Sequence, residues 1–116
     1  MASDSLKRLT SNNQLCKHLY VDESRLHGYG LFARRKLKRG EYIGTYDGPK
    51  TKRNDIHVLW VEDKPGKWCG RDGTNLLRYL NHSHKPNCEF DGFDLYTLCK
   101  IKETEELVFD YGEDPA

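Results

Sequence analysis

Glycine and proline interrupt this chain so often that no long helix fits between them. The breaks fall at Gly28 to Gly30, Gly48 to Pro49, Pro65 to Gly66, Gly70 to Gly73, and Pro86 to Asn87. Glycine adopts backbone conformations that other residues avoid, and proline lacks the amide hydrogen that helices and sheets need. The chain is therefore predicted to fold as short elements joined by turns.

The segments between these breaks are rich in β-branched and aromatic residues, which favour strands. The predicted strands span His18 to Val21, Leu31 to Arg34, Tyr42 to Tyr46, Val58 to Val61, Leu95 to Cys99, and Leu107 to Tyr111. One helical turn is predicted over Asn75 to Asn81, because Leu76, Leu77 and Leu80 are spaced to face a core. The predicted fold class is mainly β, with several small sheets and short helical turns.

At 116 residues the chain has room for one domain. We expect that domain over residues 17–116, preceded by a polar tail over residues 1–16. No apolar run approaches the roughly 18 residues that cross a bilayer, and the opening residues lack the apolar segment of a secretory signal. The four cysteines are widely spaced and form no CxxC pair, which favours reduced thiols. An intracellular protein without a membrane partner is therefore expected.

Charge is unevenly distributed along the chain. Residues 1–58 carry twelve Lys and Arg against six Asp and Glu, for a net +6, whereas residues 59–116 carry seven against twelve, for a net −5. The basic run from Arg34 to Arg39 has only Phe32 and Tyr42 as nearby aromatic residues, so it is interpreted as a solvated edge. No direct nucleic-acid partner is predicted, and the acidic second half favours a basic ligand.

Two glycines flank an aromatic residue in Gly28-Tyr29-Gly30, directly before the apolar segment Leu31-Phe32-Ala33. A backbone of this kind turns sharply and approaches a ligand closely. It lacks the third glycine and the following helix of a dinucleotide-binding fingerprint. By itself this segment predicts only a hairpin turn.

Polar side chains are dense in the segment from Arg78 to Cys88. Asn and His side chains beside a turn often cap their own backbone. His82 and His84, two residues apart, suggest a metal, but no third ligand follows at a usual zinc spacing. No metal site is therefore predicted from this segment.

A third segment, Glu105 to Gly112, is a terminal strand that ends in Tyr111, and alone it predicts an ordinary edge strand. Together, the three segments GYGLFARRKLKRGEYIGTYDG, DGTNLLRYLNHSHKPNCEF and EELVFDYG resemble the start, middle and end of the SET-domain protein lysine methyltransferases. The resemblance covers about residues 18 to 112. It is to the minimal form of the family, without pre-SET or post-SET modules.

This resemblance implies the SET-domain β-fold, in which the C-terminal segment threads beneath a loop in a pseudoknot. It implies S-adenosyl-L-methionine as the cofactor, and as methyl acceptor the ε-amine of a lysine in a basic protein or peptide such as a histone. Tyr111 matches the family's catalytic tyrosine, and it is expected to lie beside the cofactor. The other cofactor-binding residues that the resemblance implies are His27, Gly28, Tyr29, Gly30, Arg78, Asn81 and His82.

The substrate pocket that the resemblance implies consists of Phe109, Tyr46 and Trp60. Phe109 lies two residues before Tyr111 on the same face of a regular strand, and it matches the position that tunes how many methyl groups are added. The same alternation turns Glu106 and Asp110 away from Tyr111, so neither is assigned a catalytic role.

The sequence departs from the family pattern at several positions. Relatives with a post-SET module bind zinc through a cysteine directly after Asn-His-Ser, where this chain has His84, and the chain ends at Glu113-Asp114-Pro115-Ala116. No zinc is therefore expected, and the outer wall of the site is expected to come from the substrate, the tail or a second copy in a homodimer. Thr104 replaces the usual glycine before Glu105-Glu106, which implies a slightly different turn, and Val58 stands where many relatives have a pocket aromatic.

Two other functions remain open on the sequence. A catalytically silent SET-like protein-binding module would keep the fold without methyl transfer. The presence of Tyr111, Asn81 and His82 argues against that reading, and the short C-terminus argues for it. A small β-barrel that binds nucleic acid through Arg34 to Arg39 ranks last.

Overall fold

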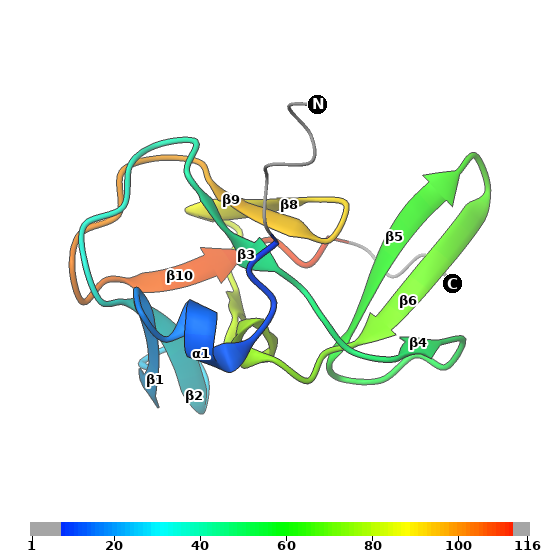
Figure 1. The fold of residues 1–116 in the computed structure, drawn as a ribbon, viewed down its shortest axis with the longest axis horizontal. Coiled ribbons are helices and arrows are strands. Elements are labelled where there is room, and N and C mark those ends of the chain that lie inside the picture. The colour runs from blue at the N-terminus through cyan, green and yellow to red at the C-terminus, as the bar shows by residue number, and fades with distance from the viewer. Residues whose placement is uncertain (1–7, 113–116) are drawn as a thin grey trace.

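Residues 8–112 are described by the computed structural model, and they form short strands joined by turns (Figure 1). The strands are β1 (Leu19–Glu23), β2 (Tyr29–Ala33), β3 (Tyr42–Thr45), β4 (Lys50–Thr51), β5 (Val58–Lys64), β6 (Lys67–Asp72), β7 (Asn81–His82), β8 (Cys88–Asp91), β9 (Asp94–Thr97) and β10 (Glu106–Phe109). The helices are α1 (Asn12–Leu15) and the 3-10 helix η2 (Leu76–Tyr79). The predicted mainly β fold is confirmed. The first seven residues of the predicted tail and the terminal residues 113–116 lie outside the described residues.

The first sheet has the order β1-β2-β10-β7. Strand β2 pairs antiparallel with β1 and with β10, whereas β10 pairs in parallel with β7. The C-terminal strand therefore lies between β2, which contains Gly30, and β7, which begins at Asn81. This order brings together the three segments that carry the family resemblance.

Two further sheets complete the fold, with the orders β3-β9-β8 and β4-β6-β5. The second of these contains the long β5–β6 hairpin, which extends to one side of the molecule (Figure 1). Strands β4, β6, β7 and β8 were not predicted from the sequence. None of the helices in the described part of the chain is long and apolar enough to cross a membrane.

Leucine and isoleucine side chains from all parts of the chain form the core. Its fully buried members are Leu15, Leu19, Leu31, Leu37, Ile43, Leu77, Leu95, Ile101 and Leu107, with Cys88. Truncating one of these leucines to alanine is expected to cost about 2 to 5 kcal/mol, because the cavity collapses only partly. The core thereby holds the first sheet against η2 and positions the segment that follows it.

Helix α1 forms within the segment that was predicted to be a polar tail. Ser11 caps it, because the Ser11 hydroxyl accepts from the Gln14 amide while the Gln14 side chain accepts from the Ser11 amide. Leu15 at its end is wholly buried. The described part of that segment thus packs onto the domain.

The predicted helical turn is present as η2, with Leu77 buried against the core. The Asn75 side chain, at the N-cap position, donates instead to the backbone carbonyls of Thr10 and Thr45 at 2.9 and 2.8 Å. These bonds tie η2 to the N-terminal segment. The start of β7 is positioned as a result.

Thr104 keeps a left-handed backbone with φ of 70°, the conformation that a glycine would adopt most readily at this position. Its amide donates to the Ala33 carbonyl at 2.7 Å, which holds the turn before β10 against β2.

Candidate functional site

Asn87 fastens the C-terminal strand to the segment after β7. Its side-chain amide donates to the Glu106 carbonyl at 2.8 Å, and its side-chain oxygen accepts from the Val108 amide at 2.8 Å. The Ser83 amide also donates to the Phe109 carbonyl at 3.1 Å. Because Asn87 is buried, these bonds are shielded from water and fix where β10 ends.

Tyr111 follows β10 and contacts the segment around β7 through both backbone and side chain. Its hydroxyl donates to the Leu80 carbonyl at 2.8 Å, and its amide donates to His82 Nδ1 at 2.9 Å. The Tyr111 ring lies 5.0 Å from the His82 ring and 4.8 Å from the Phe109 ring, measured between centroids. Tyr111 thus contacts the residues on either side of Asn81, Leu80 and His82.

Partial burial raises the pKa of Tyr111 above its ordinary value. The phenol therefore keeps its proton at neutral pH and acts as a hydrogen-bond donor. A hydroxyl that donates once still has lone pairs with which to accept. Tyr111 can accordingly orient a bound donor without taking its proton.

Asn81 holds the loop before β2 in place. Its buried side-chain amide donates to the carbonyls of His27 and Tyr29, each at 3.0 Å, and to Glu106 Oε2 at 2.9 Å. The Ser24 hydroxyl donates to the same carboxylate at 2.8 Å. The backbone of the loop is therefore set by side chains from β7 and β10.

Gly30 is required by this arrangement. A Cβ at Gly30 would lie 2.3 Å from Glu106 Oε2, far inside van der Waals contact. Gly28, in contrast, has φ of 44° and open space where a Cβ would stand. The two glycines of the sequence motif thus serve different purposes, close packing at Gly30 and a left-handed turn at Gly28.

Glu106 was not assigned a role from the sequence, although it contacts both Asn81 and Ser24. Strand alternation turns the Glu106 side chain away from Tyr111, as expected. On that side its carboxylate reaches Ser24 in the loop before β2. The register that pairs Glu106 with Phe32 of β2 decides this contact, and no local pattern encodes that register.

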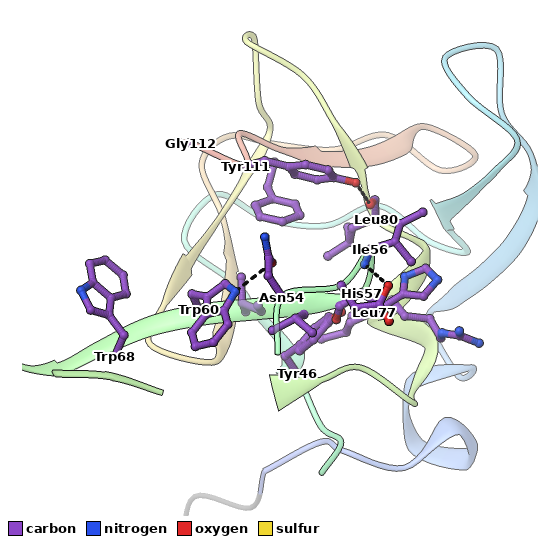
Figure 2. A pocket seen from close by; sticks show the side chains of 15 residues that line it. Tyr46, Asn54, Ile56, His57, Trp60, Trp68, Leu77, Leu80, Tyr111 and Gly112 are labelled. Carbon is purple, nitrogen blue, oxygen red and sulfur yellow. Dashed lines mark hydrogen bonds between the residues drawn. The ribbon is translucent and has the colours of Figure 1, made fainter. Parts of the chain in front are cut away.

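A cleft of about 470 Å³ lies beside Tyr111, and Tyr111 is one of the residues that line it. It is lined by Tyr46, Asn54, Asp55, Ile56, His57, Val58, Leu59, Trp60, Trp68, Leu77, Arg78, Leu80, Phe109, Tyr111 and Gly112. In Figure 2 the Tyr111 side chain runs along one side of the cleft, with Tyr46 and Trp60 on the other. The cleft therefore contains all three predicted pocket residues, together with Tyr111 and Arg78.

The remaining predicted cofactor residues do not line this cleft. His27, Gly28, Tyr29, Gly30, Asn81 and His82 are absent from its walls. They gather instead around the Asn81 side chain and the Tyr111 amide. Tyr111 is the predicted residue that touches both groups, so it stands where the two parts of the site meet.

Phe109 and Tyr46 both line the cleft, and Phe90, which does not line it, packs between their rings. Phe90 lies edge-on to Phe109 with centroids 5.0 Å apart, and Tyr46 lies edge-on to Phe90 at 5.8 Å. Burial, assisted by the charge of Asp72, raises the pKa of Tyr46 to about 12. The Tyr46 hydroxyl is thus a neutral donor, and it bonds to the His57 carbonyl.

The β5–β6 hairpin and the loop before it also line the cleft. Trp60 donates from its indole nitrogen to Asn54 Oδ1 at 3.1 Å (Figure 2). Val58 and Trp60 both line the cleft. Trp68 of β6, which the sequence analysis missed, adds an exposed indole to the rim.

Arg78 contributes a cation to the cleft. Its Nε is buried and has no hydrogen-bond partner among the described residues. Its guanidinium lies 5.6 Å from the centre of the Tyr79 ring. Since a buried donor without a partner is costly, this nitrogen is suited to an acceptor on a bound ligand.

A comparison with known families accounts for this geometry. The model of the SET domain matches residues 28–112, from the glycine pair to the residue after Tyr111. This chain belongs to the SET domain family. The resemblance inferred from the three sequence segments is thereby confirmed.

Curated relatives of this SET domain carry the names of histone-lysine N-methyltransferases. MEDEA of Arabidopsis thaliana is 30% identical over 88% of this chain, and NSD3 of Mus musculus is 29% identical over 89%. The protein trr of Drosophila melanogaster is 30% identical over 84%. The chain spans only 18%, 9% and 5% of the lengths of these relatives, respectively.

Proposed function

We propose that this SET domain transfers a methyl group from S-adenosyl-L-methionine to the ε-amine of a lysine in a basic protein, with histones as the first substrate class to test. The observation that carries the proposal is the position of Tyr111, whose hydroxyl bonds to the Leu80 carbonyl at the wall of an aromatic cleft. The names of the relatives support histone lysine as the acceptor.

The residues around the loop before β2 suit that cofactor. Tyr29 is 62% exposed, and a Cβ at Gly28 would meet nothing within 4 Å, so the loop is open to a ligand. Arg78 offers a buried Nε that lacks a partner. His27, Gly28, Tyr29, Asn81 and His82 would hold the cofactor on this side of Tyr111. When bound, S-adenosyl-L-methionine supplies a methyl group on a positively charged sulfur.

The acceptor lysine must be neutral before it can accept a methyl group. A free lysine has a pKa of about 10.4, so deprotonating it at pH 7 costs about 4 to 5 kcal/mol. The rings of Tyr46, Phe109 and Trp60 line the cleft and disfavour the charged ammonium form by removing water from it. The cleft therefore lowers the pKa of a bound lysine without a strong base.

Tyr111 then orients the neutral amine. Because its hydroxyl proton is directed to the Leu80 carbonyl, its oxygen presents lone pairs to an N–H of the amine. Holding the amine in line with the methyl group removes much of the entropic barrier to the reaction. This role requires position and not proton transfer, which agrees with the raised pKa of Tyr111.

Two measurements on the full chain test the proposal. Calorimetry measures binding of S-adenosyl-L-methionine, and transfer of a tritiated methyl group to histones and basic peptides measures activity. We expect saturable binding and labelling of lysine. Binding without labelling of any substrate would instead support the alternative of a silent SET-like binding module, and absence of binding would overturn the proposed methyl transfer.

The same proposal includes a homodimer. Ile56 is 79% exposed and Trp68 is also exposed at the rim of the cleft, and a second copy that covered them would add to the wall of the site. Two-fold dimers are the commonest soluble oligomers. Light scattering is expected to show a dimer, and a monomer under conditions of full activity would contradict it.

A further inference from the structure

Two histidines and an aspartate meet beside Tyr111, outside the aromatic cleft. His82 Nε2 and His84 Nε2 are 3.5 Å apart. Asp110 places one carboxylate oxygen 3.7 Å from His82 Nδ1 and the other 3.6 Å from His84 Nδ1. One ligand atom from each of the three residues falls within 4.8 Å of the others. We propose that His82, His84 and Asp110 form a binding site for a divalent transition-metal ion of the zinc class.

The spacing of the two imidazoles suits such an ion. In a tetrahedral zinc site with Zn–N bonds of about 2.05 Å, two ligand nitrogens lie about 3.3 Å apart. The two Nε2 atoms are 3.5 Å apart, close to this spacing, whereas the Asp110 oxygens lie beside the two Nδ1 atoms, so the imidazole and carboxylate groups must turn before all three residues hold one ion. Imidazole nitrogen and carboxylate oxygen are both common zinc ligands, and a water molecule would complete the coordination.

Exposure allows the side chains to complete the geometry. The His84 side chain is 86% exposed and that of Asp110 is 44% exposed, so neither is held by the core. Turning Asp110 exchanges the 2.9 Å hydrogen bond that its Oδ1 accepts from the Gly112 amide. The carboxylate belongs to the segment after β10, whereas both histidines belong to β7 and the turn after it. An ion held by all three residues would therefore bridge the two segments that position Tyr111.

The tautomer of His82 links this site to Tyr111. The Tyr111 amide donates to His82 Nδ1, so in the neutral ring the proton is on Nε2. A metal at Nε2 requires that proton to move to Nδ1, where it faces the Tyr111 N–H. A metal at Nδ1 replaces the hydrogen bond directly. In either case, metal binding and the bond from the Tyr111 amide exclude each other.

Metal binding at this site therefore removes one of the two hydrogen bonds that hold Tyr111 against the segment around β7. Loading the site releases the Tyr111 amide from His82, although the hydroxyl bond to Leu80 remains available. An effect of metal binding on methyl transfer rests on the proposed function. The metal site itself and the release of the Tyr111 amide do not.

Titration of metal-free full chain with Co²⁺ tests the site. Its visible absorption reports the coordination geometry, and Zn²⁺ is expected to displace it at a one-to-one ratio. His84→Ala and Asp110→Asn are expected to weaken binding by at least about tenfold. His18→Ala is the matched control, because His18 lies outside the cluster and its loss is expected to change nothing.

Exposed thiols need a separate control. Cys16 and Cys99 are exposed, and thiolate ligation of Co²⁺ adds a near-ultraviolet charge-transfer band. The titration is therefore repeated in Cys16→Ser/Cys99→Ser, where we expect the same affinity and no such band. Equal binding by wild type, His84→Ala and Asp110→Asn, or binding that disappears with the two cysteines, would overturn the site.

Hydrogen exchange of the Tyr111 amide tests the link. We expect saturating Zn²⁺ to accelerate exchange of this amide severalfold in wild type and not in His84→Ala. Unchanged exchange in the metal-saturated protein would overturn the link. Neither this measurement nor the titration uses methyl transfer, so an inactive protein that binds Zn²⁺ at these residues would contradict the proposed function and leave the metal site standing.

Discussion

The Tyr111 hydroxyl donates a 2.8 Å hydrogen bond to the carbonyl oxygen of Leu80. This bond joins the segment after the last strand to the backbone directly before Asn81, and the Tyr111 amide reinforces it through His82. A tyrosine that is 55% exposed is thereby held in one orientation at the edge of the cleft.

Tyr111→Phe is expected to abolish most methyl transfer while the protein stays folded. The change removes the oxygen that orients the amine and one hydrogen bond worth about 1 kcal/mol of stability. Thermal unfolding, S-adenosyl-L-methionine affinity and tritium transfer are measured together. Tyr20→Phe serves as control, because Tyr20 stacks on Phe32 away from the cleft. Near wild-type turnover in folded Tyr111→Phe would remove Tyr111 from the mechanism.

Phe109→Tyr is expected to shift the products toward monomethyl-lysine. The Phe109 ring lies 4.8 Å from the Tyr111 ring and has no hydroxyl with which to bind the amine or a water. Wild type is therefore expected to add more than one methyl group, and the added hydroxyl narrows that space. Mass spectrometry of a lysine peptide gives the distribution, with Phe32→Tyr as the control. A wild-type enzyme that stops at one methyl group would show that Phe109 lacks this role.

Asn81→Ala is expected to weaken S-adenosyl-L-methionine binding by about 1 to 3 kcal/mol, with the fold largely intact. The Asn81 side chain holds the carbonyls of His27 and Tyr29, so its loss frees the loop that would receive the cofactor. Calorimetry measures the affinity, and Asn13→Ala in exposed α1 is the control. If folded Asn81→Ala binds the cofactor as wild type does, the assignment of this loop is wrong.

Thr104→Gly is expected to stabilise the protein by roughly 0.5 to 1 kcal/mol. A left-handed backbone such as that of Thr104 costs a residue with a side chain roughly 1 to 2 kcal/mol. Glycine avoids this cost, but it also makes the unfolded chain more flexible, which offsets part of the gain. Urea unfolding measures the difference. Glu103→Gly, one residue earlier and also exposed, is expected to destabilise because its φ is not positive. The same sign for both substitutions would refute the strain at Thr104.

Cys88 is expected to resist alkylation while Cys16 and Cys99 react. Burial raises the pKa of Cys88 to about 12, so almost no reactive thiolate is present at pH 8. Iodoacetamide labelling followed by peptide mass spectrometry ranks the cysteines, and labelling in urea provides the reference in which all react. Labelling of native Cys88 at the rate of Cys16 would contradict its burial.

Local sequence patterns predicted the strands and helices whose own residues favour that structure. The apolar and aromatic residues from Leu31 marked β2, and the spacing of Leu76, Leu77 and Leu80 marked η2. Strand β6 was missed because Lys67–Asp72 is largely charged or polar and contains a glycine. It is a strand because both of its edges pair, with β5 and with β4. Such pairing is invisible in the segment itself.

The family motifs also named the residues of the candidate site, from His27 to Tyr111, and their roles there stay predictions. Their partners came from the tertiary structure alone. Asp110 meets His84, and Glu106 meets Asn81, only because β10 pairs in parallel with β7. Parallel strands need a long connection, so packing of the whole core decides which distant segments meet. A local pattern records only the periodicity of each strand, and periodicity does not determine which distant strand it pairs with.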